Sequence, residues 1–236
     1  MTYWFREKHK AVSLPTWGML VKKNVKMLAA LLTAVVAIEA HASTVSAEGG
    51  NITTVDDVGV ARQLTQSGRD SAPVVSPDGR HIVFVRQTPR HKVDTALGPE
   101  SASEIWLMNV DGSAQRLLVE GRNDKDPKHA LAALHSPIFS PDGRVVYFLS
   151  SAWATSGSVH AIDLANAKER FVTAGNSLDV IPAGRYAGDL IVNQHRYWLA
   201  GGSYDWFWLV SPTGEDRGPI GPDSSDVEHF KSLFAK

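Results

Sequence analysis

The stretch SAPVVSPDGRHIVF at residues 71–84 recurs as SPIFSPDGRVVYF at residues 136–148. Both copies centre on Ser-Pro-Asp-Gly-Arg. Pro77 presets φ for the second position of a tight turn, Asp78 can hydrogen-bond to nearby backbone, and Gly79 can take the positive φ that closes a hairpin. The same three positions in the second copy are Pro141, Asp142 and Gly143. Internal repetition predicts a repeat architecture, and here the repeated unit contains a hairpin.

An apolar run follows each turn, IVFV at residues 82–85 and VVYFL at residues 145–149. The runs are continuous and do not alternate with polar residues, so we expect both faces of these strands to be buried. A strand in a blade that is packed between two other blades has this pattern.

Further strands complete each unit. Residues 104–110, 158–164 and 207–210 each end at a turn whose closing residue tolerates the left-handed conformation: Gly112, Asn166 and Gly214. Outer strands are expected near 115–119, 170–172 and 217–220. The sequence predicts three four-stranded blades, at about 71–120, 136–173 and 179–220. The third has lost the Ser-Pro-Asp-Gly turn.

A partial blade is expected before the first full one, with strands at 52–55 and 61–65. The Pro-, Gly-, His- and charge-containing stretches at 87–103 and 121–134 are predicted to be loops on the blade rim. Val227, Phe230 and Phe234 recur at helical spacing, so a short helix is expected over 226–234, with Ser225 or Asp226 as its cap. The fold class is therefore all-β, a β-propeller of four-stranded antiparallel blades with about three blades plus a partial one.

These residues, at 64–65, 71–84, 104–112 and 136–148, resemble the repeat of the TolB-like β-propeller family. Similar repeats form the propeller domains of prolyl oligopeptidase relatives and are loosely akin to WD-type repeats. The resemblance covers residues 61–173 well and 174–220 weakly, and it indicates a fold more than a function. Propellers of this family normally have about six blades and an added N-terminal domain.

The chain has room for about three and a half blades, whereas a closed ring usually takes at least four. Three alternatives remain open. A second copy completes the ring, the propeller is open, or the chain is a shortened remnant of a longer propeller protein. Exposed blade edges would favour association between copies.

The pattern of the first 42 residues predicts an export signal. Lys22, Lys23 and Lys26 precede an apolar run at 27–38, and small residues follow at 40–42. Cleavage is expected after Ala42, with either Met1 or Met19 as the start. The run has 12 residues where a spanning helix needs about 20, so no stable membrane insertion is expected after cleavage. The expected domains are a signal with N-terminal extension at 1–42, a linker or partial blade at 43–60, propeller repeats at 61–220, and a tail with a short helix at 221–236.

The composition of the chain excludes some classes of binding partner and of chemical site. Beyond residue 42 the chain has 18 Lys and Arg against 23 Asp and Glu, and no basic run, so nucleic-acid binding is not expected. The absence of cysteine excludes disulfides, thiolate metal sites and a cysteine nucleophile. A periplasmic or secreted location is compatible with such a chain.

No catalytic motif is visible in the sequence, and no cofactor is predicted. There is no Gly-x-Ser-x-Gly nucleophile elbow and no His-Glu-x-x-His pair. His160 and His195 lie on predicted strands and are the best metal-ligand candidates, because some propeller-fold lyases of sugar polymers use a histidine with a metal. Without clustered partners, a strand histidine facing solvent or a neighbouring blade is the simpler interpretation.

Six aromatic residues fall within residues 197–208. Core packing accounts for many aromatics in a degenerate blade, but aromatics also stack on sugars and anchor protein interfaces. Trp198, Tyr204 and Trp206 are the candidates for an exposed binding surface.

The expected function is that of an exported, non-catalytic propeller that binds a protein or peptide partner in the bacterial cell envelope, as the TolB-like resemblance implies. The alternative is a propeller that binds or processes a carbohydrate or peptide, or a remnant without independent function.

Overall fold

The computed structural model describes residues 44–236. The expected export signal and its cleavage point after Ala42 lie outside the described residues. Within the described part of the chain, no helix has the length and apolar character needed to cross a membrane.

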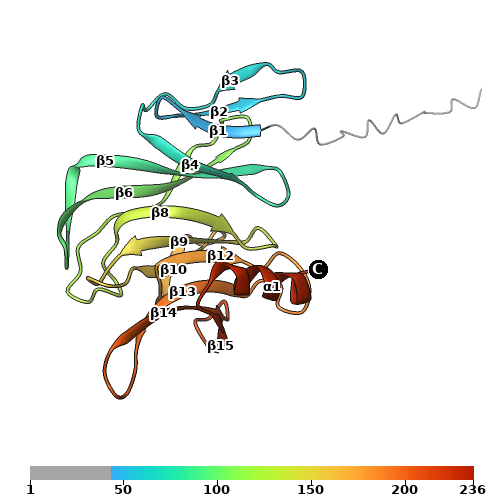
Figure 1. Ribbon diagram of the computed structural model, residues 1–236. Coiled ribbons are helices and arrows are strands. Elements are labelled where there is room, and N and C mark those ends of the chain that lie inside the picture. The colour runs from blue at the N-terminus through green and yellow to red at the C-terminus, as the bar shows by residue number, and fades with distance from the viewer. Residues whose placement is uncertain (1–43) are drawn as a thin grey trace, which may run out of the picture. The chain divides into compact units, whose positions relative to one another are not determined.

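Four antiparallel sheets follow one another in chain order (Figure 1). Sheet 1 contains β1 (Thr44–Glu48), β2 (Asn51–Val55) and β3 (Ala61–Gln63). Sheet 2 contains β4 (Asp70–Val75), β5 (His81–Thr95), β6 (Gly98–Asn109) and β7 (Arg116–Glu120). Sheet 3 contains β8 (Ala132–Phe139), β9 (Val145–Ser151), β10 (Ser158–Asp163) and β11 (Lys168–Ala174). Sheet 4 contains β12 (Ser177–Val180), β13 (Leu190–Tyr197), β14 (Ser203–Val210) and β15 (Asp216–Gly221), and α1 (Ser224–Phe234) follows it.

Three four-stranded blades and a three-stranded one confirm the predicted fold class. Apolar clusters join sheet 1 to sheet 2, sheet 2 to sheet 3 and sheet 3 to sheet 4. No apolar cluster of the described residues joins sheet 4 back to sheet 1, so these four sheets form a partial propeller.

Side chains alternate between the two interfaces of each inner sheet. In β5, Ile82 and Phe84 pack against sheet 1, whereas Val83 and Val85 pack against sheet 3. In β9, Val146 and Phe148 contact sheet 2, while Tyr147 and Leu149 contact sheet 4. All eight are at most 3% exposed, which confirms that the continuous apolar runs are buried on both faces. Each side chain buried in this way contributes about 1.5–3 kcal/mol of hydrophobic stabilisation.

The two Ser-Pro-Asp-Gly turns have the same hydrogen bonds. Asp78 Oδ1 accepts from the Arg80 N–H at 3.1 Å and from the Ser76 hydroxyl at 2.6 Å. Ser76 Oγ in turn accepts the His81 N–H at 2.9 Å. The second turn repeats these bonds with Asp142 and Ser140, and φ is 71° at Gly79 and 70° at Gly143. The serine of the motif therefore closes the turn together with the aspartate.

The prediction of a rim loop at residues 87–103 is wrong. β5 and β6 extend through it as a long hairpin, with Val93 opposite Glu100 and Thr88 opposite Ala102. Val93 is fully buried in a small cluster with Ala102 and Ala132, which holds the extension against the start of β8. The other predicted loop, 121–134, ends three residues early, because β8 begins at Ala132.

Helix α1 covers the face of sheet 4 that points away from sheet 3 (Figure 1). Val227 and Phe230 pack on Ile181, Ile191 and Leu209. The helix begins two residues earlier than expected and its N-cap is Asp223, whose N–H donates to Asp226 Oδ2 at 3.0 Å.

The outward face of sheet 1 is mostly polar, with Val55 opposite Thr44 as an apolar exception. The strand register places Ser46 opposite Thr53 and Glu48 opposite Asn51 on this face, away from the buried Ile52 side chain. The hydroxyls of Ser46 and Thr53 bond to each other at 3.0 Å. A polar outer face is the usual property of a terminal repeat in a stacked array.

Candidate functional site

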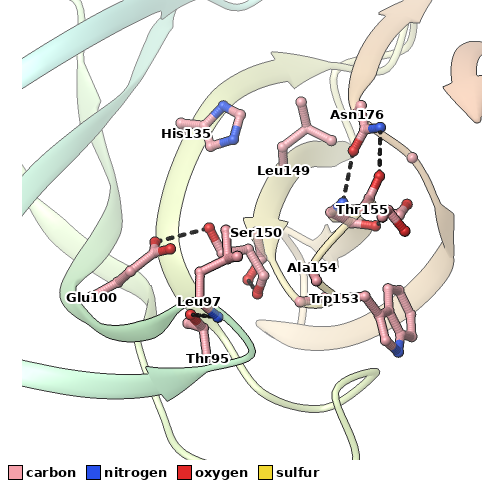
Figure 2. Close-up of a pocket in the computed structure, with 15 residues that line it drawn as sticks. Thr95, Leu97, Glu100, His135, Leu149, Ser150, Trp153, Ala154, Thr155 and Asn176 are labelled. Carbon is pink, nitrogen blue, oxygen red and sulfur yellow. Dashed lines mark hydrogen bonds between the residues drawn. The ribbon is translucent and has the colours of Figure 1, made fainter. Parts of the chain in front are cut away.

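A cavity of about 270 Å³ opens where the β5–β6 hairpin meets sheet 3 (Figure 2). The hairpin tip, the middle of β8 at His135, the end of β9 and the loop at residues 152–157 form its walls, together with two residues that lead into sheet 4. The lining residues are Thr95, Leu97, Glu100, His135, Leu149, Ser150, Ser151, Ala152, Trp153, Ala154, Thr155, Ser156, Gly157, Gly175 and Asn176.

Hydrogen bonds fix the far wall of the cavity. Asn176 Oδ1 accepts the Gly157 N–H at 2.8 Å, and its Nδ2 donates to the Thr155 carbonyl at 3.2 Å. Asn176 therefore holds the loop at 152–157 in place, and its amide has little capacity left for a ligand.

Glu100 and His135 are the titratable groups of this cavity, and Figure 2 shows them on the wall opposite Thr155 and Asn176. Ser151 Oγ donates to Glu100 Oε2 at 2.9 Å, and His135 Nδ1 bonds to Ser136 Oγ at 3.0 Å. His135 has an exposed edge, yet surrounding protein atoms displace enough water from the ring to lower its pKa, and the carboxylate of Glu100 opposes this effect.

Sequence reasoning missed this cavity. Glu100 lay in a stretch predicted as a loop, and 51 residues separate it from its partner Ser151. No local motif connects such positions, because only the extension of the β5–β6 hairpin brings them together.

His160 belongs to a chain of hydrogen bonds inside sheet 3. Its Nε2 bonds to Ser158 Oγ at 2.9 Å and its Nδ1 to Glu169 Oε1 at 2.6 Å. Arg122 donates to the other oxygen of Glu169 at 2.6 Å. Burial alone would raise the pKa of Glu169, but hydrogen bonds from His160 and Arg122 outweigh it and lower the pKa.

The connectivity of Ser158, His160 and Glu169 is that of a Ser-His-acid triad, and burial decides against a reactive role. Ser158 and His160 are both 0% exposed, so no substrate reaches the hydroxyl. The imidazole also stacks on Phe148 with ring centroids 5.5 Å apart. The group is a satisfied polar network in a packed blade.

The second metal-ligand candidate, His195, lies on β13, in a different sheet from His160. Its Nδ1 bonds to Asp205 on β14 at 2.9 Å. Among residues 44–236, no three His, Cys, Asp or Glu side chains are grouped so that they could hold a metal ion. The structure does not bring the two histidines together.

The predicted aromatic residues lie along the β13–β14 hairpin, which extends as a projecting loop in Figure 1. Trp198 is 53% exposed, and its ring stacks on that of Tyr204 with centroids 4.2 Å apart. Tyr204 meets Trp206 edge to face at 5.7 Å, and these two side chains are half-buried. Tyr197 and Leu199, at 69% and 110%, are more exposed than the three candidates.

The prolines of the two turns line a second, apolar hollow of about 220 Å³. Pro77 and Pro141 lie there with Val180 and Pro182 and with apolar residues of β4 and β8. Equivalent positions of three successive inner strands thus face one another at this end of the sheets.

No protein-family model and no curated protein matches the chain. Among solved structures, the dipeptidyl peptidase 4 of Porphyromonas gingivalis is 12% identical with a TM-score of 0.51, over 77% of this chain and 31% of that one. Puromycin hydrolase is 18% identical with a TM-score of 0.50, over 72% of this chain and 27% of that one. A protein of Agrobacterium tumefaciens provisionally classed as TolB is 16% identical with a TM-score of 0.46, over 78% of this chain and 62% of that one. The chain thus spans about a third or less of the first two proteins, and their similarity shows the propeller fold alone.

Proposed function

We propose that the protein is an exported, non-catalytic β-propeller that binds a protein partner in the bacterial cell envelope, as the TolB-like character of its repeats implies. The observation that carries this proposal is the tip of the β13–β14 hairpin, where Tyr197, Trp198 and Leu199 are exposed side by side. Large apolar side chains exposed together mark interaction surfaces, and Trp and Tyr are the residues that most often dominate interface energies.

The tip is pre-organised for binding. The backbone N–H of Trp198 donates to the Gly202 carbonyl at 3.0 Å, and the backbone carbonyl of Trp198 accepts from the Gly201 N–H at 3.0 Å, which closes the turn. The stack of Trp198 on Tyr204 restricts the indole before any partner arrives. A rigid aromatic anchor loses less conformational entropy on association than a flexible one does.

A protein partner fits the tip better than a lipid surface does. Residues 197–204 carry no charge, so the tip offers no cation to anionic headgroups. The chain beyond residue 42 has five more acidic than basic residues, which would repel an anionic membrane. The free apolar side chains are therefore suited to a pocket on another protein.

The decisive experiment places the photo-crosslinking residue p-benzoylphenylalanine at Leu199 in cells that express the protein. A matched control carries it at Val58, which is 77% exposed but lies in the β2–β3 turn of sheet 1. We expect one protein adduct from position 199 and none from position 58. Trp198→Ala should weaken the purified complex at least tenfold, or about 1.4 kcal/mol.

Lipid adducts from position 199 would show that the hairpin tip binds a membrane and not a protein partner. Identical adducts from both positions would show that the hairpin tip is not the binding surface.

A carbohydrate is the second candidate ligand for the same hairpin, because Trp198 is 53% exposed although its ring stacks on Tyr204. Sugar rings stack on exposed aromatic rings. A thermal-shift screen with oligosaccharides separates the two ideas, because a saturable rise in melting temperature that Trp198→Ala abolishes would favour the carbohydrate. Turnover of any of these sugars or of peptides would contradict the non-catalytic role.

A further inference from the structure

The cavity beside the β5–β6 hairpin carries one formal charge. Glu100 supplies it, and His135 is the other titratable residue among the fifteen that line the cavity. No Lys or Arg lines the cavity, so it is an acidic site as long as the imidazole is neutral.

Glu100 and His135 can each offer one acceptor atom to a ligand on that wall. Ser151 uses Glu100 Oε2 and leaves Oε1 without a protein partner in the described part of the chain. His135 Nδ1 bonds to Ser136 Oγ, and Nε2 is an acceptor in the tautomer in which Nδ1 carries the proton and donates to that hydroxyl. The hydroxyls of Thr95, Ser150 and Ser156 already donate to backbone carbonyls.

The remaining surface suits an aliphatic chain. Leu97, Leu149 and Ala154 contribute apolar side chains to the lining. A volume of about 270 Å³ lies just below the range of about 300–1,000 Å³ typical of drug-sized ligands, so the cavity has room for one long side chain or a small molecule.

We propose that this cavity binds a primary ammonium group carried on an apolar stem, as in the side chain of a lysine. The methylene groups would lie along the leucines, and the ammonium would donate to Glu100 Oε1 and His135 Nε2. A guanidinium should bind more weakly, because the Ser151 hydroxyl already uses one acceptor site of Glu100 Oε2 and competes with the second arm of a bidentate pair. The cavity is separate from the hairpin tip, so an experiment can disprove one of the two proposed binding sites without affecting the other.

The experiment is an NMR titration of the protein with Nα-acetyl-lysine N-methylamide. The uncharged norleucine analogue and the arginine analogue serve as ligand controls. We expect saturable shifts of amides at residues 95–100 and 151–157 with the lysine probe, at least tenfold weaker binding of the norleucine analogue, and weaker binding of the arginine analogue. Glu100→Gln should weaken lysine binding at least tenfold, whereas Glu120→Gln, an exposed change on β7, should not affect it.

Acidification provides a second readout. Glu100 is the charged group that acts on His135, and a protonated imidazole would repel the ammonium. Affinity should therefore fall as the pH drops through the lowered pKa of His135, and His135→Gln should bind lysine with a flatter pH dependence. Equal binding of the lysine and norleucine probes, no saturable shift in the cavity, or unchanged binding by Glu100→Gln would overturn the proposal.

Discussion

Asp70 shows how a single buried carboxylate is held in this fold. The side chain is 1% exposed, and Arg86 donates to both of its oxygens at 2.6 and 2.9 Å. The guanidinium lies 4.4 Å from the Trp106 ring centroid. Burial alone would raise the pKa of Asp70, but hydrogen bonds from Arg86, Thr65 and Ser67 outweigh it and lower the pKa.

We predict that Asp70→Asn lowers the free energy of unfolding by about 3 kcal/mol at neutral pH, because Arg86 keeps its charge and loses its partner. The contribution of Asp70 is complete above its unfolded-state pKa of about 3.9 and is lost as the pH falls toward the lower folded-state pKa. The variant should therefore show a flatter loss of stability in acid than the wild type. Urea denaturation across this pH range measures both effects, with the exposed Glu48→Gln as the control. An equal acid dependence in Asp70→Asn would contradict the assignment.

A substitution at Ser158 tests whether the hydrogen-bond network of Ser158, His160 and Glu169 is structural or reactive. Ser158→Ala removes the hydroxyl that bonds to His160 Nε2, so a buried ring nitrogen loses its partner. We expect a loss of about 1–3 kcal/mol in unfolding free energy. The variant should bind the partner of the hairpin tip as the wild type does. Ester or peptide hydrolysis that disappears in Ser158→Ala would show instead that the network is reactive.

At the scale of single elements, helix α1 takes the position that a further blade would occupy against sheet 4. Val227 is 7% exposed and lies in the cluster that joins the helix to this sheet. Lys231 Nζ also bonds to Asp179 Oδ2 on β12 at 2.5 Å.

Val227→Asp should release α1, because an unpaired carboxylate cannot stay in that cluster. We expect unfolding free energy to fall by about 2–3 kcal/mol, and the exposed sheet face to cause self-association. Sedimentation velocity and dye binding measure these effects, and Leu233→Asp, at a position that is 58% exposed, is the matched control. A monomeric Val227→Asp protein with unchanged stability would show that the helix does not protect the sheet.

The sequence predicted those elements whose signals are local. Pro77, Gly79 and their repeat fixed the turns, and the apolar run at residues 82–85 indicated burial on two faces. The β5–β6 extension was not predicted, because Pro89, Gly98 and Pro99 give this stretch the composition of a loop. Its stability depends on Val93 contacting Ala132, which lies far away in the chain.

The candidate sites, too, could be predicted only where the signal lies within one short stretch of sequence. The aromatic cluster at residues 197–208 was visible as composition, but the exposure of Leu199 at the hairpin tip depends on the turn that Gly201 and Gly202 make. His160 stood out as a polar residue on a strand. Its partner Glu169 could be found only from the pairing of β10 with β11.

On the scale of the whole described unit, both terminal faces of the stack are protected. Sheet 1 presents polar residues outward, and α1 covers sheet 4. Neither face offers the apolar surface that a neighbouring blade would need. Ring completion by a second copy, one of the three alternatives left open by the sequence, would require α1 to move.

We therefore predict that a chain beginning at Ser43 is monomeric in solution. Its mass from light scattering should correspond to one copy, and small-angle scattering should fit an open stack of four sheets. A dimer with the profile of a closed ring would contradict this prediction.

The alternation of side chains along β5 and β9 has a consequence for how such a gene could change in length. Each inner sheet presents one set of residues to the sheet before it and another to the sheet after it. Duplication or deletion of one whole unit would disturb only the junctions on either side, whereas loss of half a unit would leave an apolar face without a partner. Within residues 44–236, the face of sheet 1 that points away from sheet 2 and helix α1 would stay in place after such a change, because neither lies at a junction between two inner sheets.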